Sequence, residues 1–212
     1  MPRSPVHCLA KLHKEFEVLR KLDFSNQQHY SKLLLAGKRP RLTKAQIHLL
    51  TEGLFSNAFR CYQLFLNEVF LLYCTGRYSC RKKRVKSFLN AKNILHAKEL
   101  IQSSMPYLDW SNPNTVLDRA ELYLQDGYPI KQSIATNREG LLDLERVRNH
   151  IAHMSDESKR GYLKTLKNHF GVDPLRVPPP GKYLLLPHRT IVTQYYLLYY
   201  FDLIERVSGL IV

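Results

Sequence analysis

Apolar residues recur at intervals of three and four along most of the chain, which is the pattern of amphipathic α-helices. The longest such run covers residues 44–74, and its second half is apolar on every side, which predicts a helix deep in the core. Residues 23–41 and 129–136 lack a sustained period, so we expect a partly helical connection ending in a basic loop, and an irregular segment. Further helices are predicted over 7–22, 91–104, 113–127, 138–153, 157–169 and 189–211. Because strands and helices do not alternate, the predicted fold class is all-α, a helical bundle.

Residues that favour the ends of helices occur at the boundaries of several predicted helices. Thr43 is expected to cap the helix over 44–74, and Gly76 to end it. Asn137 is expected to cap the helix that follows it. Ser155 precedes two acidic residues and reads as a new N-cap, so we expect the chain to break just after His153. Proline residues make 177–187 a connector, with a short extended piece.

The stretch 141–154, with the sequence LLDLERVRNHIAHM, separates into two faces on a helical projection. Its apolar face spans about 120° and consists of Leu141, Leu144, Val147 and Ile151. Its polar face carries Glu145, Arg148, Asn149 and His153. Arg148 and His153 lie about 140° apart on a regular helix, too far to hold one small group together. Either the helix bends or a second copy of the chain contributes.

These residue types suit the cleavage of RNA without a metal ion. The reaction needs a proton taken from the 2′-hydroxyl, a proton given to the leaving 5′-oxygen, and positive charge near the phosphate. Histidine exchanges protons near neutral pH, and arginine holds phosphate by a two-pronged hydrogen bond. Asn149 can orient either neighbour. The alternative is an ordinary solvated helix face.

The charge of the chain points to a polyanionic partner. The 212 residues carry a formal net charge of +14, with a pI near 9.7. No carboxylate occurs between Glu68 and Glu99, where basic residues accumulate beside two aromatic ones. We predict contact with RNA phosphates there, the alternative being a solvated loop. The predicted RNA-binding residues are Arg77, Arg81, Lys82, Lys83, Arg84 and Lys86.

The sequence gives no sign of a metal or cofactor site. The four cysteines form no CxxC pair, and the scattered histidines show no ligand spacing, so neither a zinc site nor a disulfide framework is expected. No signal-peptide pattern or long uncharged apolar run is visible, so we expect a cytoplasmic protein that does not span a membrane.

The run RNHIAH, Arg148 to His153, resembles the Arg-polar-x3-His signature of the HEPN superfamily (higher eukaryotes and prokaryotes nucleotide-binding). The apolar lead-in, the small Ala152 and the long early helix are also similar to that family. The resemblance covers about 43–171 and implies a HEPN-type helical bundle with additional N- and C-terminal helices. It divides the chain into an N-terminal helical arm over 1–42 and a HEPN-like domain over 43–212, of which 172–212 is the connector and last helix.

The resemblance also implies a function. Members are metal-independent endoribonucleases that leave a 2′,3′-cyclic phosphate, often as toxins or anti-phage and abortive-infection effectors with a cognate antitoxin or regulatory protein. It implies a homodimer in which Arg148 of one subunit and His153 of the other flank one phosphate of the RNA substrate, with Asn149 assisting. Glu145 is expected to support Arg148 or Asn149, and His150 to be a flanking, structural residue.

Two other interpretations remain open at this point. The chain could be a non-catalytic HEPN-like module that binds RNA or nucleotides or scaffolds a partner, or a basic amphipathic protein that docks on anionic membranes. The C-terminal helix is rich in tyrosine, which suits a core or a subunit interface, and we favour the interface.

Overall fold

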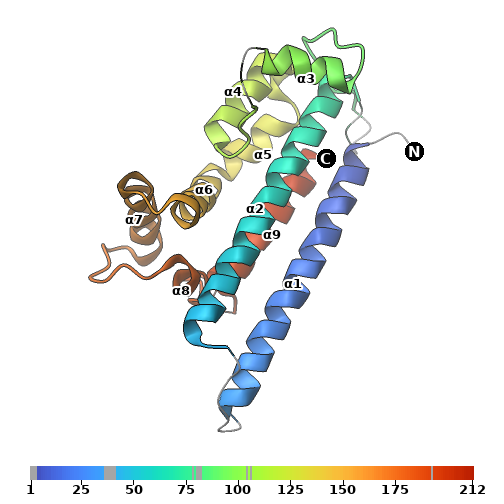
Figure 1. The fold of residues 1–212 in the computed structure, drawn as a ribbon. Coiled ribbons are helices and arrows are strands. Elements are labelled where there is room, and N and C mark those ends of the chain that lie inside the picture. The colour runs from blue at the N-terminus through green and yellow to red at the C-terminus, as the bar shows by residue number, and fades with distance from the viewer. Residues whose placement is uncertain are drawn as a thin grey trace. The chain divides into compact units, whose positions relative to one another are not determined.

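The computed structural model describes residues 4–35, 42–77, 79, 83–103, 105, 107–191 and 193–212, without the side chains of His29, Lys32 and Leu34. Within these ranges every regular element is a helix, which confirms the all-α prediction (Figure 1). The α-helices are α1 (Pro5–Leu35), α2 (Lys44–Cys74), α3 (Ile94–Gln102), α4 (Pro113–Tyr123), α5 (Ile130–Thr136), α6 (Arg138–His153), α7 (Asp156–Phe170), α8 (Pro180–Leu184) and α9 (Tyr196–Ile211). A 3₁₀ turn, η1 (Gln125–Gly127), follows α4.

The contacts group the residues into two compact units. The first unit contains residues 1–13, 61–142 and 203–212, and the second contains 14–60 and 143–202. Helices α3, α4 and α5 therefore belong to the first unit, and α7 and α8 to the second. The domain boundary placed after residue 42 from the sequence remains a prediction.

Helix α1 is longer than the apolar pattern predicts. It runs unbroken for 31 residues, so the connection that we expected to be partly helical is helical from residue 23 as far as Leu35. The segment contains no glycine or proline that would end a helix, and its buried Asp23 accepts a hydrogen bond from the Tyr195 hydroxyl. The expected basic loop lies outside the described residues.

Helix α2 has the bounds predicted from the sequence. Thr43 and Gln46 cap it reciprocally, since the Gln46 amide donates to Thr43 Oγ1 (3.3 Å) and the Thr43 amide donates to Gln46 Oε1 (2.7 Å). Gly76 follows its end with a φ of +75°, a conformation that glycine adopts without strain.

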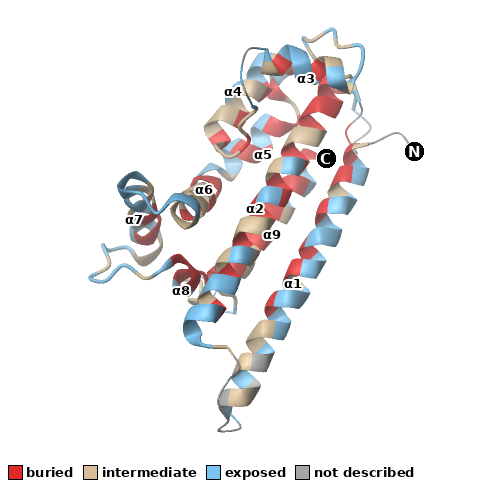
Figure 2. Cartoon of the chain, viewed as in Figure 1, coloured by how far each residue is buried: buried red, intermediate tan, exposed pale blue. Residues whose placement is uncertain are grey.

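The second half of α2 forms the core of the first unit. Val69, Phe70 and Tyr73 are fully buried there, which confirms the prediction of a deep position (Figure 2). The Phe70 ring lies 5.0 Å from that of Trp110 between centroids. The Tyr73 hydroxyl donates to the carbonyl of Ile211 in α9 at 2.8 Å. Long-range aromatic and polar contacts thus join three parts of the sequence in this unit.

Four predicted boundaries need correction. The helix predicted as far as residue 127 ends at Tyr123, and the 3₁₀ turn η1 follows it. The segment 129–136 contains the helix α5, whose seven residues are too few to show a period although Ile130 and Ile134 are buried. Helix α3 is shorter than the predicted 91–104, because Asn93 caps it through the His96 amide. Helix α9 begins at Tyr196 instead of residue 189, after a turn closed by a hydrogen bond from the His188 amide to the Gln194 carbonyl (2.7 Å).

The proline-rich connector contains the short helix α8, which is packed against α2. The Gly181 amide donates to Glu52 Oε1 at 2.7 Å, and a β-carbon on Gly181 would lie 2.3 Å from the His48 carbonyl oxygen. Tyr183, in the same helix, is fully buried. A short helix in close contact therefore replaces the expected extended piece.

The aromatic residues of α9 are part of the core. Tyr196, Tyr200 and Phe201 are at most 1% exposed, and Phe201 contacts Phe16 of α1 edge to face at 5.2 Å. These three rings therefore belong to the core, the other role that the sequence left open. Tyr195 and Tyr199 are half-buried, and the subunit interface remains a prediction.

Candidate functional site on α6

The candidate site lies on the part of α6 that belongs to the second unit. Helix α6 ends at His153, Met154 follows with a φ of +47°, and Ser155 caps α7 by accepting a hydrogen bond from the Ser158 amide (3.2 Å). The predicted break is confirmed. However, the helix is continuous through His153, so the break does not turn His153 toward Arg148.

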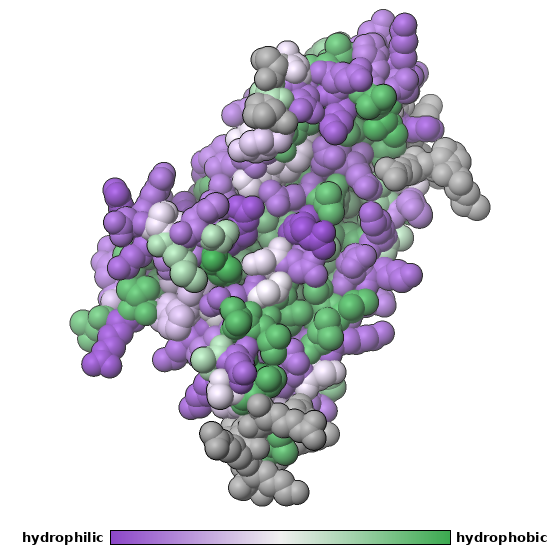
Figure 3. Space-filling model, in the orientation of Figure 1, coloured by the Kyte–Doolittle hydropathy of each residue, from purple (hydrophilic) through white to green (hydrophobic). Residues whose placement is uncertain are grey.

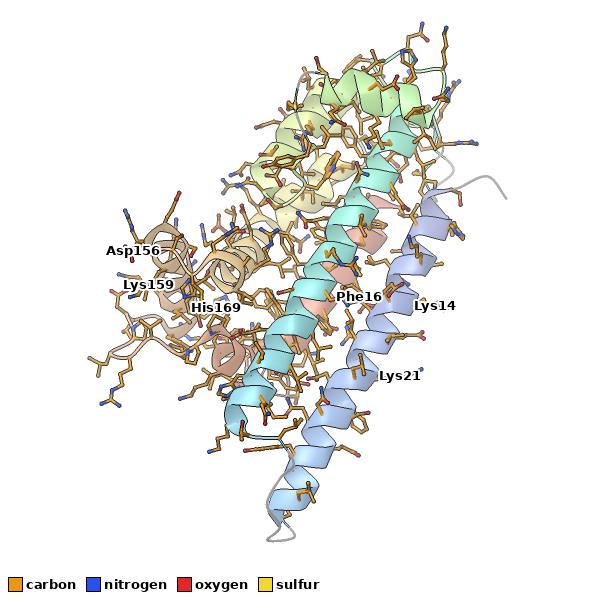
Figure 4. The ribbon with its side chains drawn as sticks, viewed as in Figure 1. Lys14, Phe16, Lys21, Asp156, Lys159 and His169 are labelled. Atoms are coloured by element: carbon orange, nitrogen blue, oxygen red, sulfur yellow. The ribbon has the colours of Figure 1, made fainter. Side chains whose placement is uncertain are left out.

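A buried carboxylate attaches α6 to α7. Asp143 accepts hydrogen bonds from Thr165 Oγ1 (2.8 Å) and Arg146 Nη1 (2.8 Å), and its Oδ2 lies 3.3 Å from His169 Nε2. His169 is on the side of α7 that meets α6 (Figure 4). Burial alone would raise the Asp143 pKa, but the hydrogen bonds from His169, Thr165 and Arg146, together with the charge of His169, outweigh it and lower that pKa.

Arg148 is held in place by its neighbours. Its Nη1 donates to Asn149 Oδ1 at 2.8 Å, and its guanidinium carbon lies 5.3 Å from the centre of the Phe59 ring in α2. Arg148 and Asn149 are both half-buried. A guanidinium has five N–H donors, so the bond to Asn149 leaves capacity for a phosphate oxygen. The structure thus brings together two of the three predicted catalytic residues.

His150 faces the neighbouring helix α7. Its ring stacks on Tyr162 with centroids 4.9 Å apart and planes 19° apart, and its Nδ1 lies 3.2 Å from Ser158 Oγ. Burial lowers the His150 pKa, and the charge of Lys159 lowers it further. A neutral, stacked imidazole of this kind contributes to packing between α6 and α7.

His153 has a different environment from His150. It occupies the last residue of α6 and is exposed, as is Ala152 beside it. Glu145 is half-buried one turn before Arg148 and Asn149. The polar face predicted from the sequence therefore presents one restrained guanidinium and one exposed imidazole.

The basic residues singled out for RNA binding belong to the first unit. Arg81 and Lys82 lie outside the described residues. Arg77, Lys83, Arg84 and Lys86 are exposed. The last three line one hollow, and Arg77 lines another.

A buried chain of hydrogen bonds was missed by the sequence analysis. Beyond Asp143, His169 Nδ1 lies 2.6 Å from the Tyr183 hydroxyl, which lies 2.9 Å from the Tyr200 hydroxyl. Burial raises the pKa of both tyrosines. The available signal was Asp143 itself, an acid between two leucines in the sequence that lies about 40° from the edge of the apolar face. Its partners are far away in sequence and could not be inferred.

Among the described residues, no group of three or more His, Cys, Asp or Glu side chains is placed to bind a metal ion. None of the described helices combines the length and apolar character needed to cross a membrane.

Comparisons with known proteins returned no relative. The chain matches no protein-family model, no curated protein sequence and no solved structure.

Proposed function

We propose that this protein is a metal-independent endoribonuclease of the HEPN type that cleaves RNA through Arg148 and His153, with Asn149 as a positioning residue. The observation that carries the proposal is the geometry of α6. Asn149 and Phe59 restrain the Arg148 guanidinium, while His153 on the same helix is exposed to solvent. Phosphodiester cleavage requires both kinds of group, a preorganised cation for the phosphate and a side chain that exchanges protons with the substrate.

The chemistry is transesterification at phosphorus. A neutral imidazole of His153 takes the proton of the 2′-hydroxyl as the 2′-oxygen attacks phosphorus. The bond from phosphorus to the 5′-oxygen breaks, and a protonated imidazole gives a proton to that oxygen. The products are a 2′,3′-cyclic phosphate and a free 5′-hydroxyl. Arg148 donates hydrogen bonds to the phosphate oxygens as their negative charge grows.

A homodimer supplies two Arg148–His153 pairs, each with its two residues on different subunits, and in either pair the imidazole that takes the 2′-hydroxyl proton can give it to the 5′-oxygen. Because α6 is continuous through His153, the angle between Arg148 and His153 on one helix stays near 140°. A two-fold axis that pairs two α6 helices places Arg148 of one copy near His153 of the other. The wide angle between Arg148 and His153 on one helix therefore supports a site shared by two chains over a site within one chain.

Control of such an enzyme is part of the proposal. An uncontrolled ribonuclease in the cytoplasm damages its own cell, so we infer a toxin or an anti-phage, abortive-infection effector restrained by a cognate antitoxin or regulatory protein.

The test is incubation of the purified protein with total RNA in EDTA, beside Arg148→Ala and His153→Ala. We expect 2′,3′-cyclic phosphate ends from the parent protein and a loss of at least about 100-fold in each variant. Circular dichroism checks that the variants are folded. Equal cleavage by parent and folded variants contradicts the proposal, and salt-sensitive binding without cleavage favours a non-catalytic RNA-binding module.

A further inference from the structure

Two hollows in the first unit lie next to each other and are lined by basic residues. The first, of about 220 Å³, is lined by Lys83, Arg84, Lys86, Gln125, Asp126 and Tyr128. The second, of about 560 Å³, is lined by Thr75, Gly76, Arg77, Lys92, Asn93, Ile94 and Leu95. They adjoin at Gly76, because Arg84 Nη2 lies 3.5 Å from the position that a β-carbon on Gly76 would take.

The backbone that carries these cations is held firmly. Val85, between Arg84 and Lys86, is 1% exposed, and its amide donates to the Arg77 carbonyl at 3.2 Å. On the other side, the Gln125 amide donates to the Lys86 carbonyl at 2.9 Å. A buried anchor and hydrogen bonds on two sides distinguish this segment from the solvated loop that a charge run usually forms.

The balance of charge in the hollows favours an anionic ligand. Among the described residues, five cations line the hollows, against the single carboxylate of Asp126. Within the part of the chain that the structure describes, no ion pair joins Lys83, Arg84 or Lys86 to a carboxylate. Hydrophilic residues also cover much of the surface over α3 (Figure 3). The cations are therefore available to a polyanion.

The remaining lining groups match the bases of an unpaired strand. Gln125 and Asn93 offer amide groups, and Asp126 offers a carboxylate, to base edges that are accessible only when RNA is single-stranded. Tyr128 presents a ring on which a base can stack, at present covered by Lys83 Nζ 4.6 Å from the ring centre. Its hydroxyl is fixed by Ser79 Oγ at 3.1 Å.

We propose that Lys83, Arg84, Lys86, Arg77 and Lys92 form a basic track that binds single-stranded RNA across both hollows. The cations contact successive phosphates, and Gln125, Asp126 and Tyr128 contact bases. The track belongs to the first unit, whereas the candidate catalytic residues belong to the second. The inference deepens the proposed function and rests on it for the identity of the polyanion as RNA.

The experiment measures binding without cleavage. A fluorescent, fully 2′-O-methylated single-stranded oligonucleotide of about 12 nucleotides has no 2′-hydroxyl to attack, so anisotropy reports affinity even if the protein is a nuclease. The test variant is Lys83→Ala/Arg84→Ala/Lys86→Ala. The matched control is Lys14→Ala/Lys21→Ala/Lys164→Ala, which removes the same charge at exposed helix positions outside the track. Figure 4 shows Lys14 and Lys21 on α1. A third variant, Lys83→Arg/Arg84→Lys/Lys86→Arg, keeps the charge.

We expect the test variant to lose at least about tenfold in affinity near 100 mM salt and to show a shallower dependence of log K on log salt. The control and the charge-keeping variant bind within about threefold of the parent. Equal loss of affinity in the test variant and in the control overturns the proposal, because binding would then depend on net charge and not on the basic track. A test variant that binds like the parent also overturns it, and so does tighter binding of a duplex than of the single strand.

Two further measurements distinguish RNA binding at the basic track from the proposed nuclease activity and from binding to membranes. If no RNA is cut in EDTA but the test variant loses binding, the nuclease fails and the track stands. If RNA is cut but the test variant binds like the parent, the track fails and the nuclease stands. Flotation with phosphatidylserine vesicles tests a membrane as the polyanion: loss of vesicle binding in the test variant with unchanged RNA affinity overturns the assignment to RNA.

Discussion

Two histidines three residues apart on α6 have opposite environments. His150 stacks on Tyr162 and contacts Ser158, whereas His153 is exposed at the end of the helix. The two side chains point in different directions, because residues three apart in sequence lie about 60° apart around a helix. The helix also ends at His153, before the break at Met154. These environments fit a packing role for His150 and the proposed chemical role for His153.

Replacing each histidine in turn by phenylalanine distinguishes the role of His150 from that of His153. His150→Phe keeps a ring stacked on Tyr162 and loses only the contact to Ser158, so we expect cleavage to persist and stability to change by about 1 kcal/mol. His153→Phe replaces an exposed residue, so stability is expected to stay within about 0.5 kcal/mol while cleavage is lost. Thermal unfolding and RNA cleavage measure both. The assignment is wrong if the two variants exchange these outcomes.

Asp23 on α1 makes stability depend on pH. Burial raises its pKa from 3.8 to about 6, although Gln27 and the charge of Arg20 oppose the change. The folded pKa lies above the unfolded one, so this stabilising contribution is complete below about pH 4 and is lost as the pH rises through 6. We expect Asp23→Asn, which still accepts the Tyr195 hydrogen bond, to raise the free energy of unfolding at pH 7 by about 1 kcal/mol, allowing for solvent screening.

Urea unfolding at several pH values between 4 and 7 measures this effect. The difference between parent and Asp23→Asn is expected to grow over that range. A difference that is constant with pH contradicts the role given to Asp23.

At the scale of elements, close contact between helices depends on single glycines. Helix α8 approaches α2 so closely that the Gly181 position has no room for a side chain, and the neighbouring atom is a backbone oxygen that cannot rotate away. Gly53 of α2, in contrast, faces open space, since a β-carbon there meets nothing within 4 Å. The same residue type therefore serves different purposes in the two helices.

Alanine substitution is expected to have opposite effects at these glycines. Gly181→Ala separates α8 from α2 and is expected to lower the free energy of unfolding by about 2–3 kcal/mol or more. Gly53→Ala is expected to raise it by about 0.5–1 kcal/mol, because alanine favours the helix and clashes with nothing. Denaturant unfolding of both variants gives the answer. A stable Gly181→Ala protein contradicts the packing of α8 described above.

The elements recovered from the sequence are those that carry strong local signals. The bounds of α2 followed from its long period, Thr43 and Gly76, and the start of α7 followed from Ser155. Helices α5 and α8 were missed because each is too short for periodicity, and what stabilises α8 is contact with the distant residues Glu52 and His48. The sequence alone does not show such contacts.

The candidate site was predictable only in part for the same reason. Arg148, Asn149 and His153 are neighbours in sequence and could be grouped from helix geometry. The Phe59 ring beneath Arg148 and the partners of Asp143 come from other helices. Their contribution needed the structure.

At the scale of the whole molecule, the net charge of +14 acts on folding and on binding in opposite directions. Like charges repel in the compact state, which salt relieves, while salt weakens contacts with a polyanion. We expect the midpoint of thermal unfolding to rise by about 2–4 °C between 20 and 300 mM salt, roughly 1 kcal/mol, while affinity for single-stranded RNA falls. Circular dichroism and anisotropy follow the two quantities. If both the unfolding midpoint and the RNA affinity fall as the salt concentration rises, this view of the net charge is contradicted.

The central claim is that two copies of α6 build one ribonuclease site. Mixing Arg148→Ala with His153→Ala tests it most directly, because a mixed dimer regains one intact pair, Arg148 from one subunit and His153 from the other. We predict that each variant alone is inactive in EDTA and that an equilibrated mixture recovers about a quarter of the parent activity, since half the dimers are mixed and each has one of two pairs. A mixture as inactive as its components contradicts the shared site, and cleavage by either variant alone contradicts the chemistry.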